Sequence, residues 1–479
     1  MTALVVNPRF DFQAPLPPMA DLGRVHFIGV GGSGMSGIAH LFARHGLDVS
    51  GCDGSASDAV AALRHAGIPV VVGHDPGHVA GLDTIVVSSA IPETNPELAA
   101  ARAAGLRVLH RAQALAVSMG SQTRVAVAGA NGKTTTSAMV ASILLGVGAD
   151  PSYAIGSPLV VSGDSAALGS GAVFVVEADE SDSSFLCYRP DVAVVTNVQP
   201  DHLDFYGDYA HVEAAYAAFA DSIDADGLLV TDADDPGASR LAGHARAAGR
   251  RVVTYGEGSE ADVRLSGLAF DAAGASARLE AQGRVVPVRL SGPGRHNLHN
   301  AAGALAACWF GLDIDPGPAA QALAEFGGTR RRFEVRGSAR GVTVVDDYAH
   351  NAPKVAALMA GARSVAGGGA IRVIFQPHLF SRTRDFASDF ARGLASADQV
   401  VLLPVYGARE APIPGVGSHL ILEELAKLGF AAMLADSPDD AVAAIVAGAR
   451  PGDLVLTVGA GDVTRLGPVV LDAIGEEPL

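Results

Sequence analysis

Two segments of this 479-residue chain share one pattern, in which a short apolar run leads through a glycine turn into an apolar helix. They read "RVHFIGVGGSGMSGIAHLFARHG" (24–46) and "TRVAVAGANGKTTTSAMVASILLG" (123–146). A third segment, "IRVIFQPHLFSRTRDFASDFARGL" (371–394), repeats the strand and helix without the glycine turn. Strands that alternate with helices pair in parallel through right-handed crossovers. The chain is therefore predicted to be an α/β protein built on parallel sheets.

The length predicts about three domains, since a single hydrophobic core serves roughly 150 residues. Breaks that carry glycine and serine separate apolar blocks near Gly120 and near Gly337. We therefore expect domains at residues 1–120, 121–337 and 338–479.

Composition and charge exclude several classes of function. A formal net charge of −17 argues against a phosphate-neutralising nucleic-acid surface. The three cysteines, Cys52, Cys187 and Cys308, are far apart and lack CxxC or Cys–His spacing, so neither a disulfide framework nor a zinc site is expected. The first twenty residues lack a signal-peptide pattern, and no apolar run reaches the roughly 18 to 20 residues of a membrane span. We expect a cytoplasmic protein with no membrane partner.

The turn of the second segment has the residues of a phosphate-binding loop at shortened spacing. Only two residues stand between Gly129 and the Gly132–Lys133 pair, where the usual pattern has four. Glycines let the backbone approach phosphates, and the following helix N-terminus presents free N–H groups. Lys133 adds a cation, and the Thr134 hydroxyl is a Mg²⁺ ligand. The alternative is a Gly/Asn turn before an ordinary helix, but a lysine and three threonines at that position favour ATP.

Polar residues follow two further apolar runs in the middle of the chain. "AVFVVEADESD" leads into Glu177, and "DVAVVTNVQPDH" leads into His202. Open α/β sheets bind ligands at the carboxyl ends of their strands, and Mg²⁺ at a phosphate needs one or two protein ligands. Glu177 and His202 are therefore predicted metal ligands beside Thr134. The alternative, in which acidic residues only end strands and cap helices, is accepted for Asp182 and Asp204.

The first glycine turn admits two interpretations. Gly29-x-Gly31-x-x-Gly34 after a strand, with Asp53 nineteen residues further on, has the form of an NAD site, so that an NAD-dependent dehydrogenase is a hypothesis of a different class. A nucleotide sugar carries the same pyrophosphate. The ATP and Mg²⁺ residues in the rest of the chain favour a nucleotide sugar at this turn.

In combination, the motifs resemble those of the Mur ligases, the ATP-dependent amino-acid ligases of peptidoglycan synthesis. The resemblance covers almost the whole chain and implies a Rossmann-like N-terminal domain for a UDP-sugar, a central P-loop ATPase-type domain with a parallel or mixed sheet, and a Rossmann-like C-terminal domain for the amino acid. Within the family the chain is similar to the branch that joins L-alanine to UDP-N-acetylmuramate through an acyl phosphate. The motifs are GVGGSGMSG (29–37), SSAIPETNPEL (88–98), GANGKTT (129–135), EADESD (177–182), TNVQPDH (196–202), GRHNLHN (294–300), RRFE (331–334), DDYAHN (346–351), FQPHLFSRTRD (375–385) and VYGAREAPIPG (405–415).

The resemblance also implies roles for individual residues. The catalytic residues would be Lys133, His202, Arg332 and His350, with the general base open between the two histidines. Thr134, Glu177 and His202 would hold metal, and His350 and Arg382 the amino acid. The UDP-sugar would contact Gly31, Gly32, Ser33, Gly34, Asp53, Ser88, Ser89 and Arg111. ATP would contact Gly129, Ala130, Asn131, Gly132, Lys133, Thr134, Thr135, His296, Asn297, Asn300, Arg332 and Asp347.

Three observations refine the resemblance. No lysine occurs between Lys133 and Lys354, so the carbamylated lysine of several later Mur ligases has no counterpart. Leu379 stands where the family has an arginine that clasps the amino-acid carboxylate, and a bidentate Arg–carboxylate pair is not replaced by leucine. Asn351 stands where the alanine-adding branch has a second histidine. A murein-peptide-recycling ligase acting on the same sugar is the alternative, and either a monomer or a homodimer is compatible with the sequence.

Overall fold

The structure is a computed structural model that describes residues 4–32, 34–271, 274–408 and 410–476. The described chain forms two compact units. The first contains residues 1–266, 278–288 and 299–326, and the second contains 267–277, 289–298 and 327–479. No helix within the described ranges combines the length and the apolar character that crossing a membrane requires.

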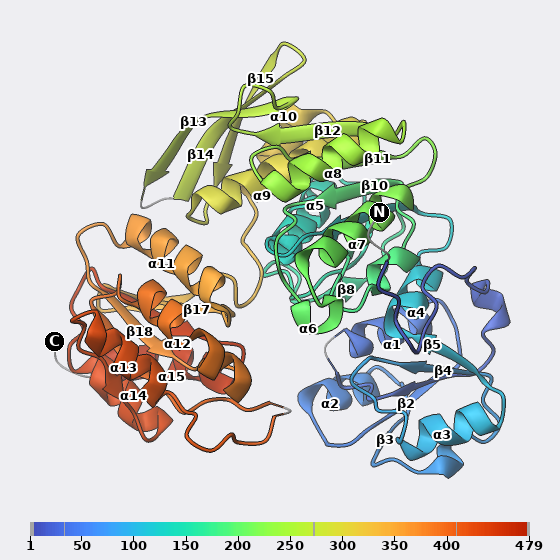
Figure 1. Ribbon diagram of the computed structural model, residues 1–479, viewed down its shortest axis with the longest axis horizontal. Coiled ribbons are helices and arrows are strands. Elements are labelled where there is room, and N and C mark those ends of the chain that lie inside the picture. Colours follow the sequence, from blue (N-terminus) through green and yellow to red (C-terminus); the bar gives the residue numbers. More distant parts are fainter. Residues whose placement is uncertain (1–3, 33, 272–273, 409, 477–479) are drawn as a thin grey trace. The chain divides into compact units, whose positions relative to one another are not determined.

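The first sheet has five strands in the order β3-β2-β1-β4-β5, and every neighbouring pair is parallel (Figure 1). Strands β1 and β4, in the middle of the sheet, are buried along their whole length, which explains why they are mostly apolar. The strands are β1 (Val25–Ile28), β2 (Val49–Asp53), β3 (Val70–Val72), β4 (Thr84–Val87) and β5 (Arg107–His110), and the helices are η1 (Met19–Asp21), α1 (Met35–Arg44), α2 (Asp58–His65), η2 (Pro76–Val79), α3 (Pro96–Ala103) and α4 (Arg111–Ser118).

The second sheet has ten strands in the order β15-β14-β13-β12-β11-β10-β6-β9-β7-β8. Strand β6, which precedes the predicted phosphate loop, is central and pairs in parallel with both β9 and β10. The strands are β6 (Thr123–Ala128), β7 (Ser152–Ala154), β8 (Ala166–Ala167), β9 (Val173–Glu177), β10 (Val192–Val195), β11 (Leu228–Asp232), β12 (Arg251–Gly256), β13 (Val263–Asp271), β14 (Gly274–Ala281) and β15 (Arg284–Leu290). The helices along this part of the chain are α5 (Lys133–Gly146), η3 (Ser184–Cys187), α6 (Leu203–Tyr206), α7 (Tyr209–Asp221), α8 (Pro236–Ala247), α9 (Arg295–Ala306), η4 (Ala307–Gly311) and α10 (Pro316–Ala324).

The third sheet has six strands in the order β16-β17-β21-β18-β19-β20, parallel except for the β16–β17 pair. Its two faces carry separate apolar clusters, since Phe375 packs with α11, α12 and α13 whereas its neighbour Ile374 packs with α14 and α15. The elements are β16 (Glu334–Ala339), β17 (Val342–Asp347), α11 (Ala352–Ala366), β18 (Ile371–Phe375), α12 (Phe380–Leu394), β19 (Gln399–Leu402), α13 (His419–Lys427), β20 (Met433–Leu434), α14 (Pro438–Val446), β21 (Leu454–Val458), η5 (Asp462–Arg465) and α15 (Leu466–Glu476).

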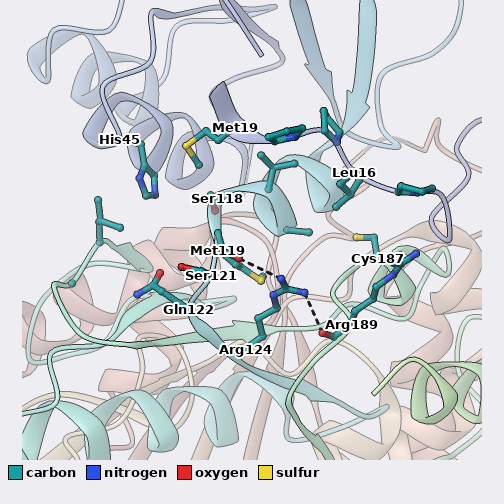
Figure 2. A pocket seen from close by; sticks show the side chains of 18 of the residues that line it. Leu16, Met19, His45, Ser118, Met119, Ser121, Gln122, Arg124, Cys187 and Arg189 are labelled. Atoms are coloured by element: carbon teal, nitrogen blue, oxygen red, sulfur yellow. Dashed lines mark hydrogen bonds between the residues drawn. The ribbon is translucent and has the colours of Figure 1, made fainter. Parts of the chain in front are cut away.

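The predicted α/β class with parallel and mixed sheets is confirmed. The domain boundaries stay predictions. Near the first of them, α4 ends at Ser118 and β6 begins at Thr123, and Arg124 donates hydrogen bonds to the backbone carbonyls of Gly120, Tyr188 and Arg189. Figure 2 shows the pocket around this guanidinium. The pocket is lined by the connecting segment and not by the predicted ligand residues.

A buried charge cluster joins α9 to the second sheet. His299 lies with Nδ1 2.8 Å from an Asp232 oxygen and Nε2 3.0 Å from a Glu257 oxygen. Burial lowers the pKa of His299, but the hydrogen bonds and charges of the two carboxylates outweigh it and raise the pKa to about 9. The imidazolium therefore holds two carboxylates from β11 and from the loop after β12.

This cluster makes stability depend on pH in a defined window. The folded pKa of about 9 lies above the ordinary value of 6.5, so the stabilisation is present below pH 6.5 and is lost as pH rises through 9. We expect the urea midpoint to fall across this window by the equivalent of about 3 kcal/mol, since one pKa unit is about 1.4 kcal/mol. His299→Gln should flatten that dependence, whereas His244→Gln, at an exposed pair with Asp221, should leave it intact. Equal pH profiles for the wild type and His299→Gln would contradict this assignment.

Candidate active site

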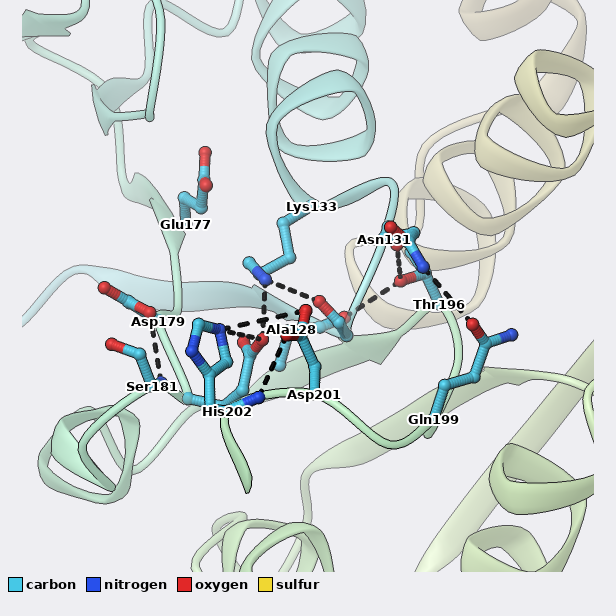
Figure 3. A network of polar contacts seen from close by, with 12 residues as sticks. Ala128, Asn131, Lys133, Glu177, Asp179, Ser181, Thr196, Gln199, Asp201 and His202 are labelled. Atoms are coloured by element: carbon cyan, nitrogen blue, oxygen red, sulfur yellow. Dashed lines mark hydrogen bonds and ion pairs between the residues drawn. The ribbon is translucent and has the colours of Figure 1, made fainter. Parts of the chain in front are cut away.

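The loop between β6 and α5 lies against the end of β10. Gly129 has φ +136°, and a Cβ added there would lie 2.0 Å from Thr196 Oγ1, so only glycine fits. Thr196 Oγ1 donates to the Asn131 carbonyl over 2.6 Å (Figure 3). The Asn197 side chain pairs with both the N–H and the carbonyl of Asn131 at 2.9 Å. Ala130 N–H donates to the Asn197 carbonyl at 3.4 Å. The loop is thus fixed by Thr196 and Asn197, the first two residues of the TNVQPDH motif.

The N-terminus of α5 is built to receive an anion. Gly132 precedes the helix in the left-handed region at φ +87°, and no side chain caps the first turn. A Cβ on Gly132 would lie 2.5 Å from Asn300 Oδ1, which places buried Asn300 of α9 against the loop. Uncapped N–H groups and the positive end of the helix dipole favour phosphate at this position, beside Lys133, Thr134 and Thr135.

Lys133 is held by a carboxylate that the sequence analysis did not assign to the site. Its Nζ donates to the Gly129 carbonyl at 2.7 Å and lies 2.8 Å from Glu180 Oε1 (Figure 3). Burial lowers the pKa of Lys133, but the Glu180 and Asp179 carboxylates outweigh it and raise the pKa. Lys133 is therefore a fixed cation, positioned by Glu180.

Two of the three predicted metal ligands are in contact. Thr134 Oγ1 donates to Glu177 Oε1 at 3.1 Å, while Glu177 Oε2 accepts from Gly156 N–H at 2.7 Å. His202 lies instead beside Glu180 and Asp201, with Nε2 3.7 and 3.9 Å from their oxygens.

The His202 group is a second set of oxygen and nitrogen donors within 4.8 Å of one another, formed by Glu180, Asp201 and His202. Together with the Thr134–Glu177 pair it provides the carboxylate-rich surroundings that Mg²⁺ prefers. The site residues around Lys133 therefore fit a divalent cation.

The glycine turn after β1 is tied to β2. Gly31 N–H donates to Asp53 Oδ2 at 2.9 Å, so Asp53 supports the turn in addition to its predicted ligand role. Gly34 has φ +80° and begins α1 without a side-chain cap, and Gly32 N–H donates to the Gly29 carbonyl at 3.1 Å. Ser33 lies outside the described residues.

Two of the other predicted UDP-sugar residues, Arg111 and Ser89, contact the EADESD segment. Arg111 Nη2 lies 2.7 Å from Asp179 Oδ2, and Ser89 donates to Asp182 and lies 3.0 Å from His110 Nε2. The Ser88 carbonyl accepts from Ile91 N–H. Asp182 therefore bonds Ser89 as well as forming part of a strand-ending segment.

The second unit places Asp347 and Arg332 together. Asp347 accepts from the Phe333 and Ala349 N–H groups at 2.8 and 2.7 Å, and burial raises its pKa. The Arg332 guanidinium lies over the Tyr348 ring, 5.3 Å from its centroid. In the same unit, Asn297 Nδ2 donates to the Pro293 carbonyl at 2.6 Å, and His296 adjoins Gly294.

His350 and Arg382 are also brought together. Arg382 Nη1 donates to the His350 carbonyl at 3.4 Å, and His350 Nδ1 lies 3.0 Å from the Tyr348 carbonyl. Burial, with nearby Lys354, lowers the pKa of His350 to about 3. His350 is therefore neutral, and so weak a base poorly suits proton abstraction near pH 7.

The two departures from the family pattern have structural contexts. Asn351 caps α11, since its Oδ1 accepts from Lys354 N–H at 3.0 Å. Leu379 precedes α12 with φ +71° and ψ 134°, a conformation that costs a non-glycine residue about 1–3 kcal/mol. Arg384 forms an exposed pair with Asp385.

Sequence reasoning missed Glu180, Asp179, Thr196 and Asn197 as site residues. Each belongs to a quoted motif, at the carboxyl end of a strand next to β6. This position in the sequence could have predicted them as site residues, because neighbouring parallel strands end at the same edge of the sheet.

Three family models match successive parts of the chain. The Mur ligase family, catalytic domain, matches residues 24–123, the Mur ligase middle domain matches 127–308, and the Mur ligase, glutamate ligase domain, matches 331–461.

Similar proteins extend over nearly the full length. A protein of Kineococcus radiotolerans named UDP-N-acetylmuramate–L-alanine ligase is 52% identical, covering 97% of this chain and 98% of the relative. One of the same name from Renibacterium salmoninarum is 50% identical over 95% of this chain and 96% of its own. The crystal structure of UDP-N-acetylmuramate–alanine ligase from Thermotoga maritima has a TM-score of 0.80 at 30% identity, covering 94% of this chain and 98% of that one. The chain belongs to the Mur ligase family of ATP-dependent ligases.

Proposed function

We propose that the protein joins L-alanine to the carboxylate of UDP-N-acetylmuramate, with cleavage of ATP to ADP and phosphate, in the synthesis of peptidoglycan precursors. The observation that carries the proposal is the 52% identity over 97% of the chain to a relative named for this reaction. The phosphate loop, with Lys133 fixed at an uncapped helix N-terminus, supports it from the site.

The chemistry follows from what an amide bond requires. A carboxylate is a poor electrophile, so the γ-phosphoryl group of ATP is first transferred to the muramoyl carboxylate, giving an acyl phosphate and ADP. The neutral amine of L-alanine attacks the acyl carbon, and the tetrahedral intermediate expels phosphate. By the family resemblance, Lys133 and Arg332 would stabilise charge on the transferring group.

We propose Mg²⁺ as the cofactor, with Thr134, Glu177 and His202 as the residues that hold it. The oxygen donors at the first two positions suit a hard cation. When bound, the ion supplies charge neutralisation for the phosphates. Glu180 positions Lys133 and faces His202, so we add it to the predicted site.

The remaining roles are assigned as the motifs suggest. Residues 1–120 would bind the UDP-sugar through the turn at Gly31, residues 121–337 would bind ATP, and residues 338–479 would bind the amino acid. We assign His350 to substrate binding rather than proton abstraction, because its pKa of about 3 makes it a weak base. We propose a cytoplasmic enzyme of small-molecule substrates.

The direct test is phosphate release from ATP with UDP-N-acetylmuramate and one acceptor at a time. We expect phosphate release when L-alanine is the acceptor. We expect none when the UDP-sugar is left out or replaced by NAD. Release with a murein tripeptide and not with L-alanine would instead identify the recycling ligase, and tight NADH binding without competition by UDP-sugar would indicate the dehydrogenase.

Glu177→Gln should raise the Mg²⁺ concentration needed for half-maximal rate, because a neutral amide oxygen holds a hard cation less well than a carboxylate. Phosphate release measured across a Mg²⁺ titration checks this. Asp204→Asn, a change at an acidic residue assigned to no ligand, is the matched control and should behave as wild type. If the Mg²⁺ dependence of Glu177→Gln equals that of the wild type, Glu177 is not a metal ligand and its role is structural.

Arg382→Ala should raise the KM for L-alanine about tenfold to a hundredfold, since a charge-assisted hydrogen bond is worth roughly 1.5–3 kcal/mol. Leu379→Arg should lower that KM by restoring a second cation, whereas Leu379→Met, which keeps the length without the charge, should not. Steady-state kinetics with varied L-alanine check both. If Arg382→Ala leaves the KM unchanged, the amino-acid carboxylate binds elsewhere.

A further inference from the structure

The first sheet contains a buried cluster of titratable side chains that the proposed reaction does not use. His26 of β1, Cys52 of β2 and Glu97 of α3 converge, and His74 and His78 join them from the segment after β3. Cys52 and Glu97 are fully buried and His26 is 3% exposed. Three of these side chains offer ligand atoms within 4.8 Å of one another.

The two oxygens of Glu97 have different surroundings. Oε1 accepts from Asp75 N–H at 3.1 Å and lies 2.5 Å from His78 Nδ1. Oε2 faces Cys52 Sγ at 2.6 Å, His74 Nδ1 at 3.5 Å and His26 Nε2 at 3.9 Å. The carboxylate is thus oriented through one oxygen, and the other is directed at the sulfur and two imidazoles.

His26 presents a nitrogen without a hydrogen-bond partner among the described residues. Its Nδ1 lies 2.8 Å from Ser50 Oγ, which fixes the ring, and the buried Nε2 is left unsatisfied. A histidine whose outer nitrogen is hydrogen-bonded and whose inner nitrogen is free has the arrangement of a metal ligand.

His74 approaches two members of this set, Cys52 and Glu97, from the solvent side. Its Nδ1 lies 3.3 Å from Cys52 Sγ and 3.5 Å from Glu97 Oε2, and its side chain is 24% exposed. Around a tetrahedral Zn²⁺ with bonds of about 2.0–2.3 Å, ligand atoms lie roughly 3.3–3.6 Å apart. The His74 distances to Cys52 and Glu97 match that spacing. Metal binding requires the 2.6 Å contact between Cys52 and Glu97 to open and His26, whose Nε2 lies 3.9 Å from Glu97 Oε2, to move closer.

We propose that His26, Cys52, His74 and Glu97 form a tetrahedral site for Zn²⁺ in the N-terminal part of the chain. The charges balance, since a thiolate, a carboxylate and two neutral imidazoles neutralise the divalent ion. Binding releases the Cys52 thiol proton to solvent and replaces it by a metal–sulfur bond. All four positions are taken by protein, which is typical of a structural site rather than a catalytic one.

The alternative is a cluster held together by protons alone. In that arrangement the charge of buried Glu97 is faced, among the described residues, by histidines and a thiol but by no lysine or arginine. It also leaves His26 Nε2 unsatisfied, which is costly for a buried polar atom. A bound cation removes both costs.

The site would act on the sugar-binding turn through Cys52. The Cys52 carbonyl accepts from the N–H groups of Gly29 and Val30, and its neighbour Asp53 holds Gly31. Fixing β2 by a metal bond therefore stabilises the base of that turn, and Zn²⁺ should raise the thermal midpoint of the full-length protein.

The test uses Co²⁺, whose bond to a thiolate gives a charge-transfer absorption band. Full-length protein stripped with a chelator and titrated with Co²⁺ should develop this band with one equivalent and lose it on addition of Zn²⁺. The Glu180, Asp201 and His202 group has no sulfur and cannot produce the band. Absence of the band in wild-type protein would overturn the proposal.

Variants assign the band to the cluster. Cys52→Ser should abolish it, whereas Cys187→Ser and Cys308→Ser, at the other two buried cysteines, should retain it. His74→Gln changes a partly exposed side chain and should weaken Co²⁺ binding at least about tenfold. If Cys52→Ser does not fold, this variant still assigns the absorption band to the cluster. His65→Gln, at an exposed histidine of α2, is its control. A band that survives in Cys52→Ser, or unchanged affinity in His74→Gln, would exclude this ligand set.

Discussion

The close approach of Gly129 to Thr196 is the contact on which the candidate active site depends. Strands β6 and β10 pair in parallel with Ala128 opposite Val195, so the segments that follow them leave the sheet side by side. A side chain at position 129 would collide with the Thr196 hydroxyl. Because Gly129 has no side chain, Thr196 and Asn197 can approach the loop and bond it directly, so that Lys133 begins its helix at a fixed place.

A strongly acidic chain binds its proposed anions through local arrangement rather than through net charge. Lys133 lies against Glu180, and Arg111 lies against Asp179 two positions along the strand-ending segment from Glu177. Breaking a buried pair is expensive unless another charge takes the partner's place. In the proposed reaction an incoming phosphate would provide that charge for Lys133. Until then the Glu180 carboxylate keeps the lysine oriented and protonated.

The two proposed cation sites differ in the chemistry of their donors. Around Glu177 and Thr134 the donors are oxygens, as a hard cation such as Mg²⁺ prefers. Around Cys52 a sulfur and two imidazole nitrogens predominate, as a softer cation such as Zn²⁺ prefers. These donor types would favour Mg²⁺ beside Glu177 and Thr134, where His202 is the only proposed nitrogen ligand, and Zn²⁺ beside Cys52.

The sequence by itself determined the α/β class, the phosphate loop and the family, because these depend on local order: apolar runs, glycine turns and motif spacing along the chain. It also predicted that Glu177 lies beside Thr134. Their contact follows because the neighbouring strands β6 and β9 end at the same edge of the sheet. Only the tertiary structure decided that Glu180 holds Lys133 and that buried Glu97 faces Cys52 and three histidines. These residues lie on different elements, and the pairing of parallel strands rather than sequence distance brings them together. Burial likewise set the low pKa of His350 and the high pKa of His299, since desolvation and neighbouring charges exist only once the chain has folded.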